Sequence, residues 1–444
     1  MPKNSVLEVR DMEQEYLFPT PPAPAIREAM AKAVNRKDEG LPVFDFSSGN
    51  IGNLLVSQAI FDKLDIQPSQ AVADELKPVV DGLVQGLMGS FYPYPKGVAY
   101  SPTGGSDVIR RLIVRYFREV HGIPLSDEDT RKVIVTAGGQ QAMTAALRSI
   151  RPGTRVLMPK WDYAPVAGIL KYHNLEEIRV DVNDDLSINI DDLKAKARPD
   201  SVFYVSMPNN PTGYVSPADL EAIVEEMSAQ GGAVVWDAPY LYTLLRLSGR
   251  EAVFDRAFLQ EQVGRFKAIT STHHSNMCVL SSLSKTCLIA GLRFGFAAAS
   301  ERWVSNMEAI IGRENLSSPT SSFIIGTEVM KSFLDRPTSY EWICRVLAGR
   351  LTTLIREIGD HLLLPGNGMF GALYVPVLAG NMPAQDFADR LISEHGVVTV
   401  PGDQFFGGPA PAVRVSLVSV PWSESEEAWA ESVSALKSAL EKMP

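Results

Sequence analysis

The chain has 444 residues, of which 45% are hydrophobic, and its formal net charge at pH 7 is -10. A domain holds roughly 100–200 residues, so this length predicts two or three lobes of an ordinary globular protein. The acidic balance argues against a nucleic-acid partner, because non-specific binding to nucleic acid needs a basic face.

The cysteines and the N-terminal sequence indicate the cellular compartment in which we expect the protein. The three cysteines, Cys278, Cys287 and Cys344, have no paired spacing, so we expect neither a disulfide framework nor a metal site. A reducing cytoplasm is the simplest compartment for such a chain. The first residues are charged and lack the apolar core of a signal peptide. We find no apolar run of the roughly 20 residues that span a bilayer, so we expect no membrane partner.

The N-terminal part of the chain predicts helices separated by glycine-rich and proline-rich loops. Residues 25–34 have amphipathic spacing, and residues 71–88 carry Val and Leu at helical spacing. Between them, the segment VFDFSSGNIGN is typical of a strand that runs into a loop. The later segment SFYPYPKGVAYSPTGG is rich in Tyr, Pro and Gly, which predicts another loop.

From about Asp107 the pattern changes to helices that alternate with short apolar strands. The helix VIRRLIVRYFREV precedes the strand KVIVTAGG and the helix QQAMTAALRSI. The further predicted strands are RVLMPK, EEIRVDV, SVFYVSMP, GGAVVWDAP, CVLSSLS and RFGFAAAS. Several are apolar on both faces, as are the buried strands of a mostly parallel sheet. The alternation therefore predicts an α/β domain of three layers.

The last third of the chain has a different organisation. A long helical stretch follows Ser332, and then come the strands GALYVPV, GVVTVPG and AVRVSLV in a shorter α+β segment. We therefore expect an N-terminal segment at residues 1–90 that joins a small domain, a large domain at residues 91–330 and a C-terminal small domain at residues 331–444.

Four local patterns occur in one order along the chain. They are TAGGQQAM from Thr136, MPNNPTG from Met207, WDAPY from Trp236 and SLSKTCLIAGLRFG from Ser282. Their order and spacing resemble the class I/II, aspartate-aminotransferase-like family of enzymes that use pyridoxal 5'-phosphate (PLP). The resemblance covers nearly the whole chain. It implies the fold-type I architecture, in which a mostly parallel sheet forms a large three-layer domain beside a small α+β domain.

The resemblance implies four residues around the reactive part of the cofactor. Lys285 of SLSKT matches the lysine that forms a Schiff base with the PLP aldehyde. Asp237 matches the carboxylate that keeps the pyridine nitrogen protonated, although a cap of a helix or turn is its structural alternative. Tyr240 and Asn210 match the hydrogen-bond donors to the phenolic oxygen. Out of context NNPTG would be a plain turn, but here we expect both a turn and a site residue.

The phosphate of PLP requires N–H groups at a helix N-terminus and a fixed cation. Six residues match the family positions for this role: Gly138, Gly139, Gln140, Ser282, Ser284 and Arg293. The spacing from Lys285 to Arg293 is that of the family. Ser282 ranks above Ser284, whose side chain can face away from the cofactor.

The cofactor ring also needs an aromatic face on which to stack. Trp161 in PKWDYAPVAG lies where the family has its stacking residue. Tyr163 is the competing candidate, and packing in the core is the structural alternative for Trp161.

Substrate binding depends on residues near both ends of the chain. Arg414 in AVRVSLV matches the arginine that binds the substrate carboxylate, for which a planar guanidinium is suited. Gly49 in SSGNIGN matches a loop that closes over the substrate, which Asn210 also contacts. Met369 and Phe370 in NGMFGAL resemble a segment that lines the pocket, and both also suit a core position.

The resemblance further implies a homodimer with shared active sites. Tyr100 matches a tyrosine that reaches the phosphate in the neighbouring subunit, while Tyr92 has the same offset to a glycine and leaves the register ambiguous. The helix that follows favours Tyr100. Arg313 and Ser317 in GRENLSSPTSS resemble a second contact across the interface, although Arg313 could equally be an exposed ion-pair partner.

Two departures from the family leave the reaction type open. Residues 92–96 add a Tyr/Pro cluster, and a long stretch before Lys285 carries His273 and His274, for which a solvated loop is favoured over an acid–base role. We expect an aminotransferase that moves an amino group between an α-amino acid and a 2-oxo acid. The alternative is elimination, replacement, cyclisation or decarboxylation on the same scaffold. A PLP-sensing regulator is remote, because no basic DNA-binding segment is evident.

Overall fold

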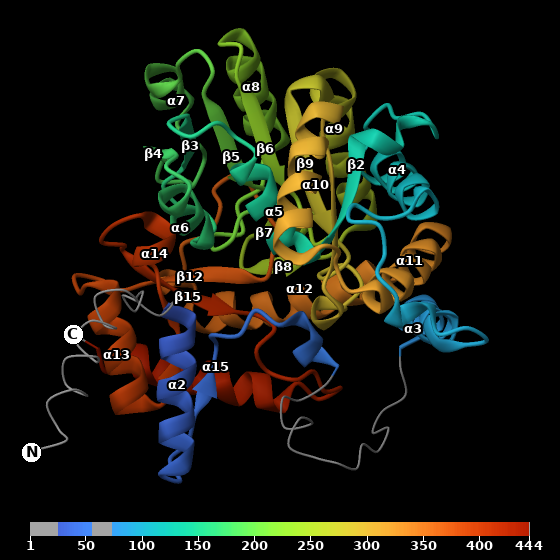
Figure 1. Cartoon of the computed structure of the whole chain (residues 1–444). Helices are drawn as coiled ribbons and strands as arrows, with labels where there is room; N and C mark the ends of the chain where they lie inside the picture. Colours follow the sequence, from blue (N-terminus) through green and yellow to red (C-terminus); the bar gives the residue numbers. More distant parts are fainter. Residues whose placement is uncertain (1–24, 56–72, 444) are drawn as a thin grey trace, which may run out of the picture.

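The computed structural model of the chain describes residues 25–55 and 73–443. Its centre is a seven-stranded sheet with the strand order β2-β10-β9-β6-β5-β3-β4 (Figure 1). These strands are β2 (Val133–Ala137), β3 (Arg155–Pro159), β4 (Glu176–Val180), β5 (Val202–Ser206), β6 (Ala233–Asp237), β9 (Met277–Ser282) and β10 (Phe294–Ala298). Only β10 runs antiparallel to its neighbours β2 and β9, which confirms the expected mostly parallel sheet.

Helices cover both faces of this sheet because both faces are apolar. Neighbouring residues on one strand enter different clusters, so that Val234 and Trp236 of β6 face one cluster and Val235 faces the other. The first cluster packs against α4 (Asp107–His121), α7 (Ile190–Lys196), α8 (Pro217–Ala229) and α9 (Arg256–His273). The second packs against α5 (Gly138–Arg148), α6 (Pro165–Tyr172) and α10 (Glu301–Asn315). The predicted three-layer arrangement is therefore confirmed.

The N-terminal and C-terminal segments together form a smaller α+β unit (Figure 1). β1 (Phe44–Asp45) pairs in parallel with β13 (Val397–Val398). A second sheet has the order β12-β15-β14, with β12 (Tyr374–Leu378), β15 (Ala412–Ser416) and β14 (Val400–Pro401). The helices of this unit are α2 (Ala25–Asp38), α13 (Ala384–His395), α14 (Asp403–Phe406) and α15 (Glu427–Leu440).

The remaining elements connect the two units. α3 (Lys77–Phe91) packs along α11 (Thr320–Asp335), and α12 (Ser339–Ile358) contacts both α15 and β8 (Glu251–Val253). β8 belongs to a small antiparallel sheet with β7 (Leu245–Ser248) and β11 (Met369–Phe370). The division of the chain at residues 90 and 330 remains a prediction.

Two boundaries differ from those expected. The helix expected at residues 71–88 begins at Lys77 after a short 3-10 turn, and residues 71–72 lie outside the described ranges. The segment GVVTVPG, expected as one strand, is interrupted at Thr399. Val397 pairs with Phe44 and Val400 pairs with Arg414, so the two halves belong to different sheets.

Among the helices at residues 25–55 and 73–443, none is both long enough and apolar enough to cross a bilayer. The cysteines Cys278, Cys287 and Cys344 are buried and unpaired.

Candidate active site

Polar side chains meet at the carboxyl ends of β5, β6 and β9. Asp237 is the last residue of β6, Ser282 is the last residue of β9, and Asn210 follows β5 by four residues. In an open parallel sheet the carboxyl ends of the strands form a common edge, where ligands bind. Lys285 follows the end of β9 by three residues, so three of the motifs found in the sequence, MPNNPTG, WDAPY and SLSKT, lie at this edge.

The Lys285 amine is held at the centre of this edge. Its Nζ atom donates a hydrogen bond to the carbonyl oxygen of Gly49, 2.9 Å away. Burial lowers the pKa of Lys285; the nearby phenol of Tyr374 opposes this shift, and the cations of Arg414 and Arg293 add to it. A lysine with a lowered pKa keeps a larger share of neutral amine, which is the form that acts as a nucleophile or a base.

A second buried group, the carboxylate of Asp237, has no cation beside it. It accepts a hydrogen bond of 3.0 Å from the hydroxyl of Tyr204. Burial raises the pKa of Asp237 to about 7, and this hydrogen bond only partly opposes the shift. Within the described ranges no lysine, arginine or histidine forms an ion pair with Asp237. A positively charged group of a ligand would therefore be a favourable neighbour for this carboxylate.

The N-terminus of α5 lies close to an arginine. The helix begins directly after β2 at Gly138, whose φ of +80° is in the region that favours glycine, and no side chain caps it. A Cβ atom at Gly138 would lie 2.6 Å from Nη2 of Arg293, and one at Gly139 would lie 3.8 Å from Oγ of Ser282. Free N–H groups, a cation and a hydroxyl together make an anion-binding site. Ser284 is also buried.

Arg414 lies on β15 with its guanidinium buried. Nη2 donates to the carbonyl oxygen of Ser47 at 2.9 Å, and Nη1 donates to Oδ1 of Asn210 at 3.5 Å. Nε has no hydrogen-bond partner among the described residues. A buried guanidinium with unused donor capacity suits a carboxylate ligand. The hydrogen bond between Arg414 and Asn210 places these two predicted substrate-binding residues side by side.

Tyr374 also belongs to this site, although the sequence reading had not selected it. It begins β12, and its ring lies edge-on to that of Tyr240, with 6.4 Å between the centroids. Burial opposes ionisation of Tyr374, but the charges of Lys285 and Arg414 outweigh burial and lower its pKa. The only sequence signal was a single tyrosine in the otherwise apolar strand GALYVPV.

The structure distinguishes the two candidates for the stacking residue. The Tyr163 hydroxyl donates to Oε1 of Gln140 at 2.9 Å, and the charges of Asp237 and Arg293 act on the Tyr163 phenol. Trp161 instead packs edge-on against Phe406, with 4.9 Å between ring centroids. The geometry therefore favours Tyr163, because the bend after β3 turns Trp161 toward the small unit.

Residues predicted at the edge of the site are exposed. Tyr100 is 84% exposed, and the side chains of Arg293 and Arg313 are also exposed while Ser317 is partly buried. Phe370, by contrast, is buried in the core. Residues expected from sequence to serve a second subunit are therefore on the surface of this one.

His273 and His274 lie away from this site. They end α9 and begin the turn before β9, whereas Lys285 follows the opposite end of β9. A six-residue strand is about 20 Å long, so these histidines are outside hydrogen-bond range of the cofactor lysine. The expectation of a solvated loop is wrong in form, because both histidines are partly buried at the end of a helix and in a 3-10 turn.

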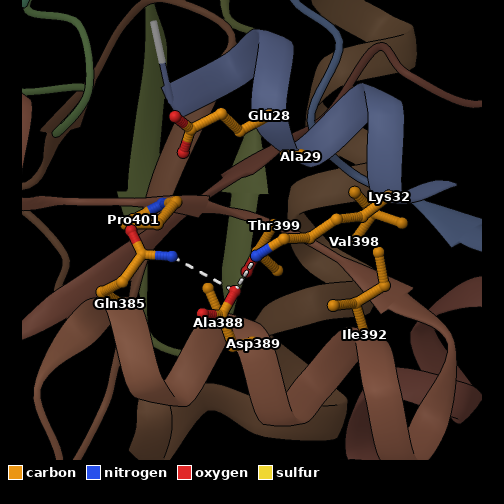
Figure 2. Close-up of a pocket in the computed structure, with 10 residues that line it drawn as sticks. All are labelled: Glu28, Ala29, Lys32, Gln385, Ala388, Asp389, Ile392, Val398, Thr399 and Pro401. Atoms are coloured by element: carbon orange, nitrogen blue, oxygen red, sulfur yellow. Dashed lines mark hydrogen bonds and ion pairs between the residues drawn. The ribbon is translucent and has the colours of Figure 1, made fainter. Parts of the chain in front are cut away.

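A pocket in the smaller unit is also separate from these residues. It lies between α2 and α13, where Lys32 forms an ion pair with Asp389 (Figure 2). Gln385 donates a hydrogen bond of 3.2 Å to the same carboxylate. The residues that line this pocket do not include any of those that surround Lys285.

The residues at the strand edge fit PLP. Asp237 is a buried carboxylate that forms no ion pair with the described residues, α5 and Arg293 form an anion site, and the charge of Arg293 acts on Lys285. These are the complements of a pyridinium nitrogen, a phosphate and an aldehyde. The fold and this set of residues define a PLP-dependent transferase of fold type I.

Residues 95–430 match the family model for aminotransferase class I and II, and the chain belongs to this family. Its members use PLP to move an amino group between an amino acid and a 2-oxo acid. The aspartate aminotransferase of Pyrococcus horikoshii is 22% identical over 351 residues, which cover 77% of this chain and 83% of that protein. The LL-diaminopimelate aminotransferase of Dehalococcoides mccartyi is 23% identical over 341 residues, with coverages of 75% and 82%.

Solved structures agree with this assignment of the fold. The aspartate aminotransferase of Thermus thermophilus with maleate superimposes with a TM-score of 0.72 at 19% identity, over 94% of this chain and 97% of that one. An archaeal alanine:glyoxylate aminotransferase gives a TM-score of 0.73 at 20% identity, over 95% and 96% of the two chains.

Proposed function

We propose that this chain is an aminotransferase in which Lys285 binds PLP covalently and Arg414 binds the α-carboxylate of an amino acid. The observation that carries the proposal is the meeting of three buried groups, Lys285, Asp237 and Arg414, from distant parts of the chain. A buried amine of lowered pKa, a carboxylate without a cation and an arginine with a free donor together match an amino-acid substrate on PLP.

When bound, PLP supplies an aldehyde that captures amines and a ring that withdraws electrons from the carbon beside the captured nitrogen. Asp237 would hold the proton on the ring nitrogen, since a carboxylate stabilises a cation that is buried with it. Tyr240 and Asn210 would donate hydrogen bonds to the phenolic oxygen. The phosphate would be held by residues of the α5 N-terminus and its neighbours: Gly138, Gly139, Gln140, Ser282, Ser284 and Arg293.

Lys285 also serves as the proton carrier in this proposal. Its neutral amine would accept the proton from the Cα atom of the bound amino acid. Arg414 would hold the carboxylate of that amino acid through its free donor. The carbonyl oxygen of Gly49 and the hydroxyl of Tyr374 lie beside the amine and hold its orientation.

The active unit in this proposal is a homodimer with Tyr100 serving the site of the partner subunit. Large apolar side chains are exposed along α3 and the loop after it: Val84, Leu87, Met88, Phe91, Tyr92, Tyr94, Val98 and Tyr100. Monomers rarely expose so many neighbouring apolar groups. Arg293 is also exposed despite its place beside the phosphate site, which supports a second copy that covers this side.

A half-reaction without any 2-oxo acid tests the proposed reaction. The PLP-loaded enzyme is mixed with a panel of amino acids, and the 2-oxo acid released is measured. Transamination yields one equivalent per site, and turnover resumes only when a 2-oxo acid is added. Continuous release of ammonia, CO2, a leaving group or a cyclised product would instead assign the alternative reactions. Borohydride trapping and peptide mapping should label Lys285, with Lys285→Ala as the control.

A further inference from the structure

A buried carboxylate beside the proposed cofactor site has no role in the chemistry described so far. Asp162 is fully buried in the bend between β3 and α6. Its Oδ1 atom accepts hydrogen bonds from the Tyr163 N–H at 2.7 Å and from the Ser206 hydroxyl. Its Oδ2 atom accepts one from the Ser206 N–H at 3.2 Å. Three donors therefore surround this one side chain.

Ser206 extends these contacts to the other side of the site. Its Oγ atom donates to Asp162 and accepts from the Asn210 N–H at 3.4 Å and from Nδ2 of Asn209 at 3.3 Å. A hydroxyl has one hydrogen and two lone pairs, so every hydrogen-bonding position of Ser206 is used. Its hydrogen can point only toward Asp162, since the other two neighbours are donors.

The donors favour an ionised carboxylate at this position. An Asp162 carboxylate is an acceptor only, and it satisfies the three donors with two oxygens. Burial raises the pKa of Asp162 to about 7, while the hydrogen bonds from Ser206 and Tyr163 and the distant charge of Arg179 act in the opposite direction. No lysine or arginine in the described ranges forms an ion pair with it. The hydrogen bonds thus act in the direction of a counter-charge and offset part of the effect of burial.

We propose that Asp162 is a positioning residue, which sets Tyr163 and Asn210 at two sides of the cofactor through the Tyr163 N–H and the Ser206 hydroxyl. The inference rests on the proposed function, in which Asn210 contacts PLP, and on Tyr163 as the stacking residue that the site geometry favours. Ser206 is also paired in register with Asp237 on the neighbouring strand. A shift of Ser206 would therefore displace Asn210 and the end of β5 that lies beside Asp237.

The direct test is an absorbance titration of bound PLP in the Asp162→Asn holoenzyme. The amide N–H group of this variant faces one of the three N–H and O–H donors, so that hydrogen bond is lost. The donor that made it is left unpaired in the interior. A displaced Asn210 no longer donates to the phenolic oxygen, and the spectroscopic pKa of the bound cofactor rises by about one unit. We expect kcat to fall about tenfold, with KM for the amino acid changed less than kcat.

Ser206→Ala is a second variant that removes only the connecting hydroxyl. It should raise the spectroscopic pKa in the same direction, because Asn210 loses its support while Tyr163 keeps its own. Asp219→Asn is the matched control, since Asp219 also accepts several hydrogen bonds, from Ile188 and Tyr214, but contacts no residue of the site. This control should keep the wild-type spectroscopic pKa even where its thermal stability falls.

Two outcomes separate the inference from the function on which it rests. If wild-type enzyme carries PLP on Lys285 and both variants keep the wild-type spectroscopic pKa and kcat, Asp162 has no positioning role and the cofactor site stands. If borohydride trapping in wild-type enzyme labels a different lysine, the proposed function fails first, and the inference with it. Should Asp162→Asn not fold, the titration of Ser206→Ala alone decides.

Discussion

The guanidinium of Arg414 lies 4.2 Å from the centroid of the Tyr374 ring, so a buried cation stacks on an aromatic face inside the site. Such a contact contributes about 0.5–2 kcal/mol, more when water is excluded. The same ring lies edge-on to that of Tyr240, and the charge of Lys285 lowers the pKa of the Tyr374 hydroxyl. Tyr374 therefore contacts both the proposed substrate-binding arginine and a residue of the cofactor pocket.

The two functions of Tyr374 can be separated by substitution. Tyr374→Phe keeps the ring under Arg414 and removes the hydroxyl, so we expect kcat to fall about tenfold with little change in KM. Tyr374→Ala also removes the stacking face and should raise KM for the amino acid. Steady-state kinetics of both variants check this. Equal increases of KM in the two variants would contradict a role of the hydroxyl in catalysis beside Lys285, because the hydroxyl would then act in substrate binding.

Arg414→Ala should mainly weaken binding of the amino acid. A charge-assisted hydrogen bond contributes about 1.5–3 kcal/mol, so kcat/KM should fall roughly 10- to 150-fold. Arg414→Lys should recover only part of this loss, because an ammonium cannot bind a carboxylate through two parallel hydrogen bonds. Arg390→Ala is the control, since Arg390 is partly exposed on α13 and its one ion pair among the described residues is with Glu394. A similar loss in the control would argue against a specific role for Arg414.

His121 predicts an acid-sensitive contribution to stability. It is buried among aromatic rings, and neither ring nitrogen has a hydrogen-bond partner among the described residues. Burial lowers the pKa of His121 from 6.5 to about 3. As the pH falls, His121 therefore binds a proton in the unfolded chain before it does so in the folded chain. The stabilisation that comes from neutral His121 is present above pH 6.5 and is lost as the pH falls toward 3.

The substitution His121→Phe isolates this contribution. Phenylalanine keeps an aromatic ring but cannot bind a proton, so the difference in unfolding free energy between variant and wild type should grow by up to about 1.4 kcal/mol per pH unit below pH 6.5. Urea unfolding from pH 7 to pH 4 measures this difference. A difference that does not depend on pH would show that His121 is not the titrating group.

The shared active sites can be tested by mixing two inactive proteins. Lys285→Ala lacks the cofactor lysine, and Tyr100→Ala lacks the residue proposed to reach the partner subunit. In a mixed dimer, one site has both defects and the other has neither, so activity should return. Heterodimers purified with two different tags supply the measurement. A lack of activity in confirmed heterodimers, or a fully active monomer, is the result that excludes shared sites.

Local patterns in the sequence by themselves determined the elements and the main chemistry. The strand GGAVVWD is apolar on both faces, so its place in a buried sheet and the position of Asp237 at its end follow from residues that are neighbours in the chain. The same holds for Lys285 after CVLSSLS and for the glycines that begin α5. In each case the signal is contained in a few consecutive residues, whose backbone preferences do not depend on the rest of the molecule.

Only the tertiary structure decided which side chains share a space. Gly49 accepts a hydrogen bond from Lys285 across 236 residues, and Tyr374 joins the site because β12 pairs with the strand that carries Arg414. Tyr163, rather than Trp161, faces the site because the bend after β3 sets the direction of both side chains. These relationships depend on the packing of one unit against the other, and such long-range packing leaves no periodic pattern in the sequence.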